Sequence, residues 1–201
     1  MRPLTKSRFK LALECPTKLY YVNNKDYEDK SQEDSFMEAL AEGGYQVGEL
    51  AKMYYPGGYE ITESGYTDPL LRTNELLKQE NVIIYEAAVL YNNLFIRVDI
   101  LEKKGNIIHV IEVKAKSFDG HGTDSFIHKK GYVEPKWSPY LQDVAFQKYV
   151  TQKAFPGYVV RAYLMLADKS KTASVNGLNQ HFQIAKSPTG RKSVTVSPGI
   201  T

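Results

Sequence analysis

The chain has 201 residues, 42% of them hydrophobic and 24% charged, with a formal net charge of +3. This length suffices for one sizeable hydrophobic core, or for one domain with a trailing segment. No apolar run approaches the length that spans a bilayer, and the N-terminus MRPLTKSRFK lacks the apolar segment of a signal peptide. We therefore expect a cytoplasmic protein without a membrane partner.

The first part of the chain has helical periodicity. Residues 5–24 carry apolar side chains at helical spacing, and Pro16 is expected to divide them into two short helices. A polar surface loop follows at 25–34. A longer helix is predicted over 35–55, although three glycines weaken it, and it ends in the turn YPGGYE. A second, shorter helix is predicted at about 68–79.

The middle of the chain changes to strand patterns. β-branched and aromatic residues predict strands, separated by NN and KKGN, at 82–91, 94–102 and 107–115. A loop at 118–139, an amphipathic helix at 140–155 and a further strand at 158–168 follow, with a last hairpin near 180–197. We predict an α+β fold in which helices flank a mixed sheet with antiparallel hairpins. Residues 1–168 form the predicted domain, and 169–201 form a polar extension.

The hairpin turns predict the register of the three central strands. If Asn92-Asn93 is a two-residue turn, Glu86 lies directly opposite Asp99. Because side chains alternate across a strand, paired residues share one face of the sheet.

The second predicted turn brings another acid to the same face. A turn centred on Lys104-Gly105 places Asp99 opposite Val110, and Glu112 one diagonal step from Asp99. Diagonal neighbours have α-carbons about 7–8 Å apart, so both carboxylates could reach a common ion.

The predicted face therefore carries Glu86, Asp99, Glu112 and Lys114. Like charges at such positions are destabilising unless something neutralises them, and Mg²⁺ accepts oxygen ligands while keeping several waters. Lys114 could hold or polarise a water activated by that metal. The alternative is that the acids face solvent, paired with Arg97 and the lysines. We interpret the pattern as a metal site.

This spacing resembles a known signature. Asp99 and, after twelve further residues, the run Glu-Val-Lys at 112–114 resemble the D…ExK motif of the PD-(D/E)XK nuclease superfamily. The order of helix, three antiparallel strands, helix and strand resembles the core of that superfamily. The blocks LTKSRFKLALECPTKLYY, AEGGYQVGELAKMYYPGG and YLQDVAFQKYV are similar to an uncharacterised bacterial branch near the RecB-type and CRISPR-associated exonucleases. The resemblance spans most of 4–168.

The resemblance implies a restriction-endonuclease-like core and a nuclease, active in DNA repair or defence, that hydrolyses phosphodiester bonds, with DNA as the expected partner. It implies that Asp99 and Glu112 bind Mg²⁺ or Mn²⁺, with the Val113 carbonyl as a further ligand. Lys114 would position the attacking water. Relatives often carry a glutamate on the preceding strand, which matches Glu86.

Two features depart from the pattern of the RecB-type relatives. Those proteins carry a Q-x-x-x-Y pair on the following helix, where this chain has Asp143 and Gln147 one helical turn apart. Both are accessory substrate-binding candidates, and the alternative is a solvated helix face. A histidine ligand expected on the first core helix is replaced by Gly48. The ligand is therefore missing or supplied by Glu42 or Glu49.

Cys15 is the single cysteine of the chain, which excludes an internal disulfide. It resembles the first ligand of the iron–sulfur cluster in the CRISPR-associated relatives, which need three more cysteines near the C-terminus. We therefore expect no cluster in this chain, with Cys15 as a free and largely buried thiol. Either the cluster has been lost, or this is the N-terminal part of a longer protein, which the ending SVTVSPGIT favours.

Other functions stay open at this point. The main alternative is a catalytically weak or inactive nucleic-acid-binding module of a larger repair or defence protein, and a third is an interaction domain in which the acids are structural. His121 and His128 lack the spacing of a zinc site. The 15 tyrosines and Trp137 could stack on bases, as aromatic residues do in single-strand-binding proteins, or pack in the core.

Overall fold

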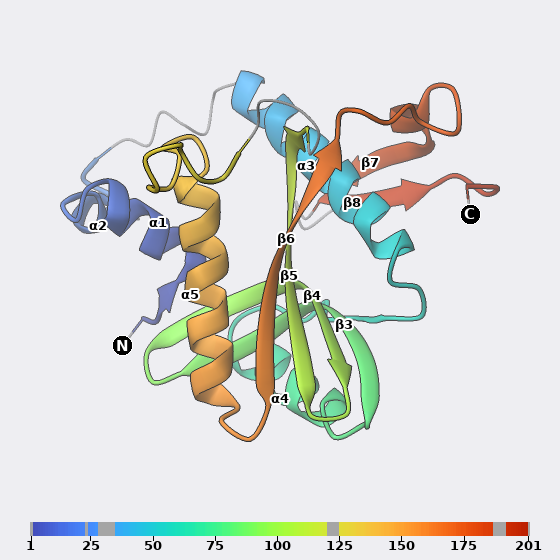
Figure 1. The fold of residues 1–201 in the computed structure, drawn as a ribbon. Coiled ribbons are helices and arrows are strands. Elements are labelled where there is room, and N and C mark those ends of the chain that lie inside the picture. Colours follow the sequence, from blue (N-terminus) through green and yellow to red (C-terminus); the bar gives the residue numbers. More distant parts are fainter. Residues whose placement is uncertain (1, 23, 28–34, 120–124, 187–191, 201) are drawn as a thin grey trace. The chain divides into compact units, whose positions relative to one another are not determined.

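The computed structural model describes residues 2–22, 24–27, 35–119, 125–186 and 192–200 (Figure 1). The helices are α1 (Lys6–Glu14), α2 (Lys18–Tyr21), α3 (Ser35–Met53), α4 (Thr67–Leu76) and α5 (Ser138–Ala154), with a 3₁₀ turn at Leu178–His181. The strands are β1 (Leu4–Thr5), β2 (Tyr59–Glu60), β3 (Asn81–Tyr91), β4 (Leu94–Lys104), β5 (Ile107–Phe118), β6 (Val159–Asp168), β7 (Phe182–Lys186) and β8 (Lys192–Val196). Among the described residues, no helix is long and apolar enough to cross a membrane.

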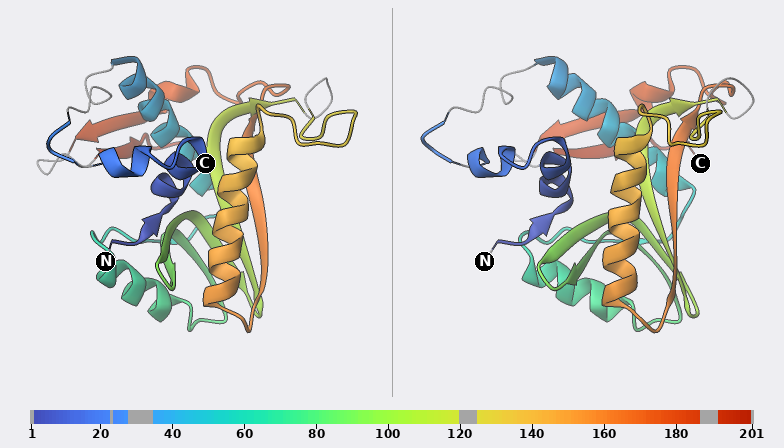
Figure 2. Two further views of the ribbon diagram at one scale, coloured as in Figure 1. Left: turned by 90° about the vertical axis from the view of Figure 1, so that its left-hand side faces the viewer. Right: turned by 60° about the vertical axis from the view of Figure 1, so that its left-hand side comes forward.

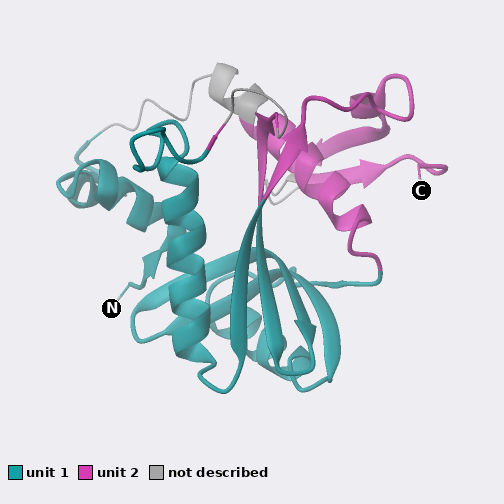
Figure 3. Ribbon diagram, in the orientation of Figure 1, with its two compact units in different colours: residues 1–28, 57–112, 126–164 teal, residues 29–56, 113–125, 165–201 magenta. Residues whose placement is uncertain are grey.

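The chain forms two compact units (Figure 3). Unit 1 consists of Met1–Glu28, Gly57–Glu112 and Phe126–Leu164, and unit 2 of Asp29–Pro56, Val113–Ser125 and Met165–Thr201. Both are assembled from separate stretches of the chain. The predicted division at residue 168 stays a prediction.

The main sheet mixes parallel and antiparallel pairs. Its strand order is β2-β3-β4-β5-β6, and β1 pairs with β4 outside that path. The β3–β4 and β4–β5 pairs are antiparallel, whereas β1–β4 and β2–β3 are parallel. Helices α4 and α5 flank this sheet (Figure 2). The prediction of an α+β fold with a mixed sheet flanked by helices is confirmed.

The β4–β5 register differs from the predicted one by two residues. The two-residue turn is Gly105-Asn106, because Lys104 pairs with Ile107, and Asp99 is therefore not opposite Val110. Gly105 occupies the first turn position, where a type II′ hairpin requires positive φ, and its φ is 56°. A shift of two residues preserves the face on which every side chain lies. The first hairpin has the predicted register.

Strands β4 and β5 separate at a defined point. Their described pairing ends at Ile100 and Ile111, one residue before Asp99 and Glu112. Beyond that point β1 pairs in parallel with the freed end of β4, where Thr5 is the partner of Phe95. The described β4–β5 pairing thus ends next to Asp99 and Glu112, and β1 is the further partner of β4 near Phe95.

A continuous apolar core holds unit 1 together. Ile84, Ile96, Leu101 and Ile108 are fully buried or nearly so, and each such side chain contributes about 1.5–3 kcal/mol by its burial. Helix α5 packs on this core through residues that include Val150, which is completely buried. The elements around the acids are therefore rigidly supported.

Unit 2 contains α3 and the antiparallel hairpin of β7 and β8. The Gln46 amide on α3 donates to the carbonyl oxygens of Asn179 at 3.1 Å and Phe182 at 2.8 Å. Phe182 is 2% exposed and anchors the hairpin. The predicted helix at 35–55 and the predicted last hairpin are confirmed.

Short elements were the hardest to predict. The break at Pro16 and the two helices around it are confirmed, and α5 begins at Ser138 rather than near residue 140. Strands β1 and β2 were not predicted, because two residues cannot display a periodicity. Most of the predicted loop at 25–34 lies outside the described residues.

Candidate functional site

An ammonium group lies between the two acids of the predicted signature. The Lys6 Nζ atom donates to both Glu112 carboxylate oxygens, at 3.0 Å to Oε2 and 3.2 Å to Oε1. The same atom is 3.6 Å from Asp99 Oδ1. Asp99 and Glu112, which lie on adjacent strands, therefore share one cation.

Two side chains of α5 complete this group. The Gln147 amide donates to Glu112 Oε2 at 2.6 Å, and its nitrogen is 3.5 Å from Asp143 Oδ1. Glu112 and Gln147 are 0% exposed and Asp143 is 1% exposed. Within the described residues, Gln147 Oε1 is buried without a hydrogen-bond partner. We call Lys6, Asp99, Glu112, Asp143 and Gln147 the Lys6 cluster.

Local structure explains how Lys6 reaches the acids. Strand β1 lies along β4, and the Thr5 hydroxyl then caps α1 by accepting from the Arg8 amide at 3.4 Å. Lys6 is the first residue of that helix. The Phe9 ring, almost one turn later, stacks on Phe146 of α5 with centroids 4.2 Å apart. Pairing at β1 and stacking at Phe9 together place Lys6 where β4 and β5 diverge.

The carboxylates keep Lys6 charged. Burial lowers its pKa, but the charges of Asp99, Glu112 and Asp143 outweigh this, and the pKa of Lys6 lies above its usual range. Lys6 is therefore an ammonium at neutral pH.

Glu86 contacts a different cation, Arg97. Its Oε2 atom is 3.5 Å from Arg97 Nε, and its side chain is 41% exposed. Glu86 has a φ of 55°, and the described β3–β4 pairing skips it. A left-handed conformation costs a non-glycine residue roughly 1–2 kcal/mol and turns its side chain from the direction that regular alternation predicts. The predicted catalytic role of Glu86 stays a prediction.

Val113 and Lys114 follow Glu112 directly on β5 but belong to unit 2. Their predicted roles as metal ligand and water-positioning residue stay predictions. The possible metal-binding roles of Glu42 and Glu49 on α3 also stay predictions. Glu49 forms an ion pair with Lys52 at 2.6 Å within unit 2.

Cys15 differs from its prediction. Its side chain is only partly buried, because Cys15 is the C-terminal cap of α1, where the chain turns into Pro16. Hydrogen bonds from the Thr17 backbone and hydroxyl lower the pKa of this thiol. Of the two histidines in the predicted loop, His121 lies outside the described residues.

Sequence reasoning missed Lys6. Its contact with Glu112 spans 106 positions of the chain, so no local pattern reveals it. One signal was available. A lysine at the start of a helix opposes the helix dipole, and α1 has no acid in its first turn. Such local inconsistencies tend to mark functional sites.

The carboxylate oxygens of the cluster match some, but not all, features of a site for a hard cation such as Mg²⁺. Among the described residues there is no group of three or more His, Cys, Asp and Glu side chains arranged to hold a metal ion. Mg²⁺, however, is usually bound by one or two carboxylates together with waters and substrate phosphates. Asp99 and Glu112 provide such a pair, and the Lys6 ammonium lies on the oxygens that a metal would use.

Comparisons of the chain with protein-family models, with curated proteins and with solved structures find no match. The resemblance to the PD-(D/E)XK superfamily therefore remains an expectation from sequence.

Proposed function

We propose that the protein is a divalent-metal-dependent nuclease that hydrolyses phosphodiester bonds, with DNA as its expected substrate. The observation that carries this proposal is the convergence of Asp99 and Glu112 on one cation. Neighbouring carboxylates repel each other in a fold unless a cation neutralises them or one of them is protonated. A carboxylate pair on neighbouring strands is a donor set that a divalent ion accepts.

Glu112 and Asp99 would have different roles in binding a metal ion and substrate. Glu112 is completely buried and is oriented by the Gln147 amide, as a metal-binding carboxylate usually is by a hydrogen-bond donor. The Asp99 side chain is 27% exposed, so a substrate phosphate would approach the cluster from its side. A divalent cation bound there would supply charge stabilisation at the phosphate and lower the pKa of a bound water.

The two lysines would have different roles. Lys6 competes with a metal ion for the same carboxylate oxygens, so it has to release at least one of them on metal binding. An ammonium released beside the site can donate to a phosphate oxygen. Lys114 keeps the proposed role of positioning the attacking water. We expect Lys114→Ala to retain metal binding, measured by calorimetry, while its cleavage rate falls by about 10²–10⁴-fold.

Cleavage of labelled DNA tests the proposal. Purified protein is incubated with single- and double-stranded oligonucleotides in Mg²⁺, Mn²⁺ or EDTA. Asp99→Asn and Glu112→Gln should abolish divalent-dependent cleavage, whereas the control Glu75→Gln, which removes an exposed acid that pairs with Arg72 on α4, should retain it. Undiminished cleavage by Asp99→Asn would refute the assignment.

A nucleic-acid-binding module without turnover is the second candidate. It is favoured by the position of Lys6, whose ammonium can neutralise the acids permanently and leave the cluster as a structural ion pair. In that case the wild-type protein binds DNA, cleaves none under any divalent ion, and shows no metal binding by calorimetry. Metal binding that depends on Asp99 and Glu112 would instead favour the nuclease.

A further inference from the structure

A small hairpin precedes α5 in unit 1. The Glu134 amide donates to the Phe126 carbonyl at 2.9 Å, and the His128 amide donates to the Tyr132 carbonyl at 2.8 Å. Gly131 closes the turn with a φ of 87°, which a residue with a side chain rarely adopts. We call residues 126–134 the 126–134 hairpin.

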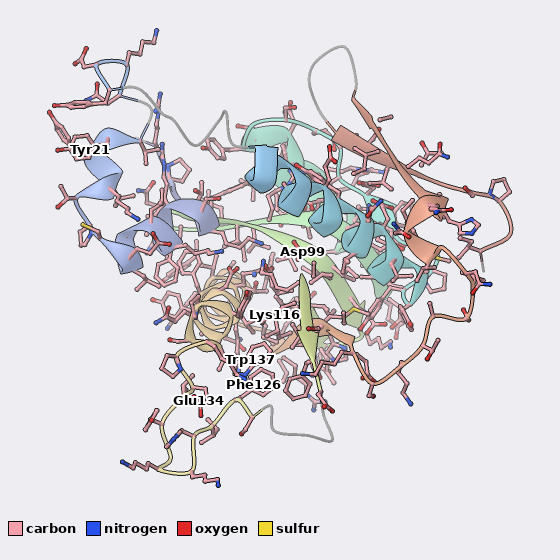
Figure 4. All side chains as sticks on the ribbon, turned by 90° about the horizontal axis from the view of Figure 1, so that it is seen from above. Tyr21, Asp99, Lys116, Phe126, Glu134 and Trp137 are labelled. Atoms are coloured by element: carbon pink, nitrogen blue, oxygen red, sulfur yellow. The ribbon has the colours of Figure 1, made fainter. Side chains whose placement is uncertain are left out.

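Aromatic packing anchors this hairpin to α5. The Phe126 ring lies on Trp137 with centroids 4.9 Å apart, and Figure 4 shows the two residues side by side. Trp137 is 1% exposed and immediately precedes α5. Asp143 of the Lys6 cluster follows Trp137 by six residues, which is about 9 Å along a helix. The base of the hairpin is therefore held close to the candidate site within the same unit.

The tip of the hairpin combines flat rings with positive charge. The rings of His128 and Tyr132 stack with centroids 4.4 Å apart and planes at 12°. The Lys130 amide donates to His128 Nδ1 at 3.1 Å, which fixes the orientation of the histidine. Tyr132 nevertheless remains 49% exposed, and Lys129 and Lys130 are exposed beside it. An ordered aromatic stack and two cations thus face solvent together.

We propose that the 126–134 hairpin binds single-stranded nucleic acid, with a base stacked on Tyr132 and phosphates on Lys129 and Lys130. A π face that is already held in place by His128 can accept a base without further ordering. The bases of a duplex have their faces covered by their neighbours, so they cannot stack on Tyr132 unless the strands separate. This proposal rests on the proposed function and extends it, because it names single-stranded nucleic acid as the substrate class.

Binding in EDTA separates this proposal from cleavage. Fluorescence anisotropy of a labelled oligothymidylate of about 20 nucleotides reports the affinity of the full chain. We expect Tyr132→Leu to weaken binding about 5- to 150-fold, because one stacked base contributes that much. Tyr132→Phe keeps the ring and should bind like the wild type.

Tyr149→Leu is the matched control. Tyr149 is 50% exposed, on α5 of the same unit, and it also contacts an aromatic ring, that of Tyr91. This control should leave affinity unchanged. Replacing both Lys129 and Lys130 by alanine should reduce the salt slope of log affinity by about 1.4, since a single strand contributes about 0.7 per phosphate contact. A duplex should bind more weakly, and single-stranded RNA of the same sequence tests whether the sugar matters.

The outcomes distinguish the two proposals. Equal affinities of Tyr132→Leu and Tyr149→Leu, or equally tight binding of duplex and single strand, overturn the hairpin proposal whatever the cleavage result. Absence of oligonucleotide binding, or binding only to phosphatidylserine vesicles, overturns it as well. Loss of binding in Tyr132→Leu, while Asp99→Asn binds at least as tightly as the wild type, supports it even if no variant cleaves DNA.

Discussion

The substitution Lys6→Met tests whether one ammonium neutralises the buried acids of unit 1. It removes the cation that lies 3.0 Å from Glu112, whose side chain is completely buried, and keeps an unbranched chain with similar helix propensity. Removing one partner of a buried ion pair costs about 3–5 kcal/mol. The side chains of Lys6 and Asp99 are 22% and 27% exposed, so water moderates the loss. We expect the free energy of unfolding to fall by about 2–3 kcal/mol at neutral pH.

Urea unfolding in EDTA, followed by circular dichroism, measures this loss. Lys10→Met, on the same helix, is the control and should change the free energy of unfolding by less than about 0.5 kcal/mol. The pKa of Lys6 is raised in the folded protein. The stabilisation by its charge is therefore fully present below the ordinary lysine pKa of about 10.4, and disappears as pH rises through the higher folded value. The difference between wild type and Lys6→Met should consequently stay constant from neutral pH to the ordinary lysine pKa and shrink in strongly alkaline solution.

Divalent cations provide a second measurement on the same pair of proteins. Lys6→Met leaves the carboxylate oxygens of Asp99 and Glu112 open to a metal, so Mg²⁺ should stabilise it more than the wild type. A ligand present at 100 times its Kd adds about 2.7 kcal/mol. If Lys6→Met is as stable as Lys10→Met, Lys6 does not neutralise the cluster. If Mg²⁺ stabilises wild type and Lys6→Met equally, Lys6 and the metal do not compete.

Three further predictions concern Glu102 and Cys15, which lie outside the cluster. Burial raises the pKa of Glu102, but hydrogen bonds with Lys104 and His109 outweigh burial, so the pKa of Glu102 is lowered. The stabilisation by the Glu102 carboxylate is therefore present above the ordinary pKa of about 4.3 and is lost as the pH falls through the folded value. Urea midpoints should therefore decline more steeply in acid for the wild type than for Glu102→Gln, and parallel declines would contradict this. The Thr17 hydrogen bonds lower the pKa of Cys15, so iodoacetamide should alkylate the folded protein near neutral pH faster than the urea-unfolded chain. Iron and acid-labile sulfide assays on anaerobically purified protein should show no stoichiometric cluster on Cys15, and stoichiometric iron would overturn that expectation.

The sequence by itself determined the longer elements of unit 1 and four of the five residues of the Lys6 cluster, all except Lys6. Alternating and continuous apolar runs predict β3 to β5, since a sheet buried on both faces needs such residues. Asn92 marked the first hairpin, and the register counted from it is the observed one. Even the misplaced second turn kept Asp99 and Glu112 on one face, because an error of two residues does not change the side of a strand. These features follow from local periods and turn chemistry.

Only the tertiary structure decided what neutralises those acids. The divergence of β4 and β5 after Ile100 and Ile111, and the entry of β1 beside Phe95, bring Lys6 to the carboxylates. That entry depends on a parallel strand of two residues, far too short to produce a pattern in the sequence. The ion pair of Lys6 and Glu112 joins positions 106 residues apart. Residues so far apart in the sequence come into contact only when the chain packs, so local propensity cannot predict their contacts.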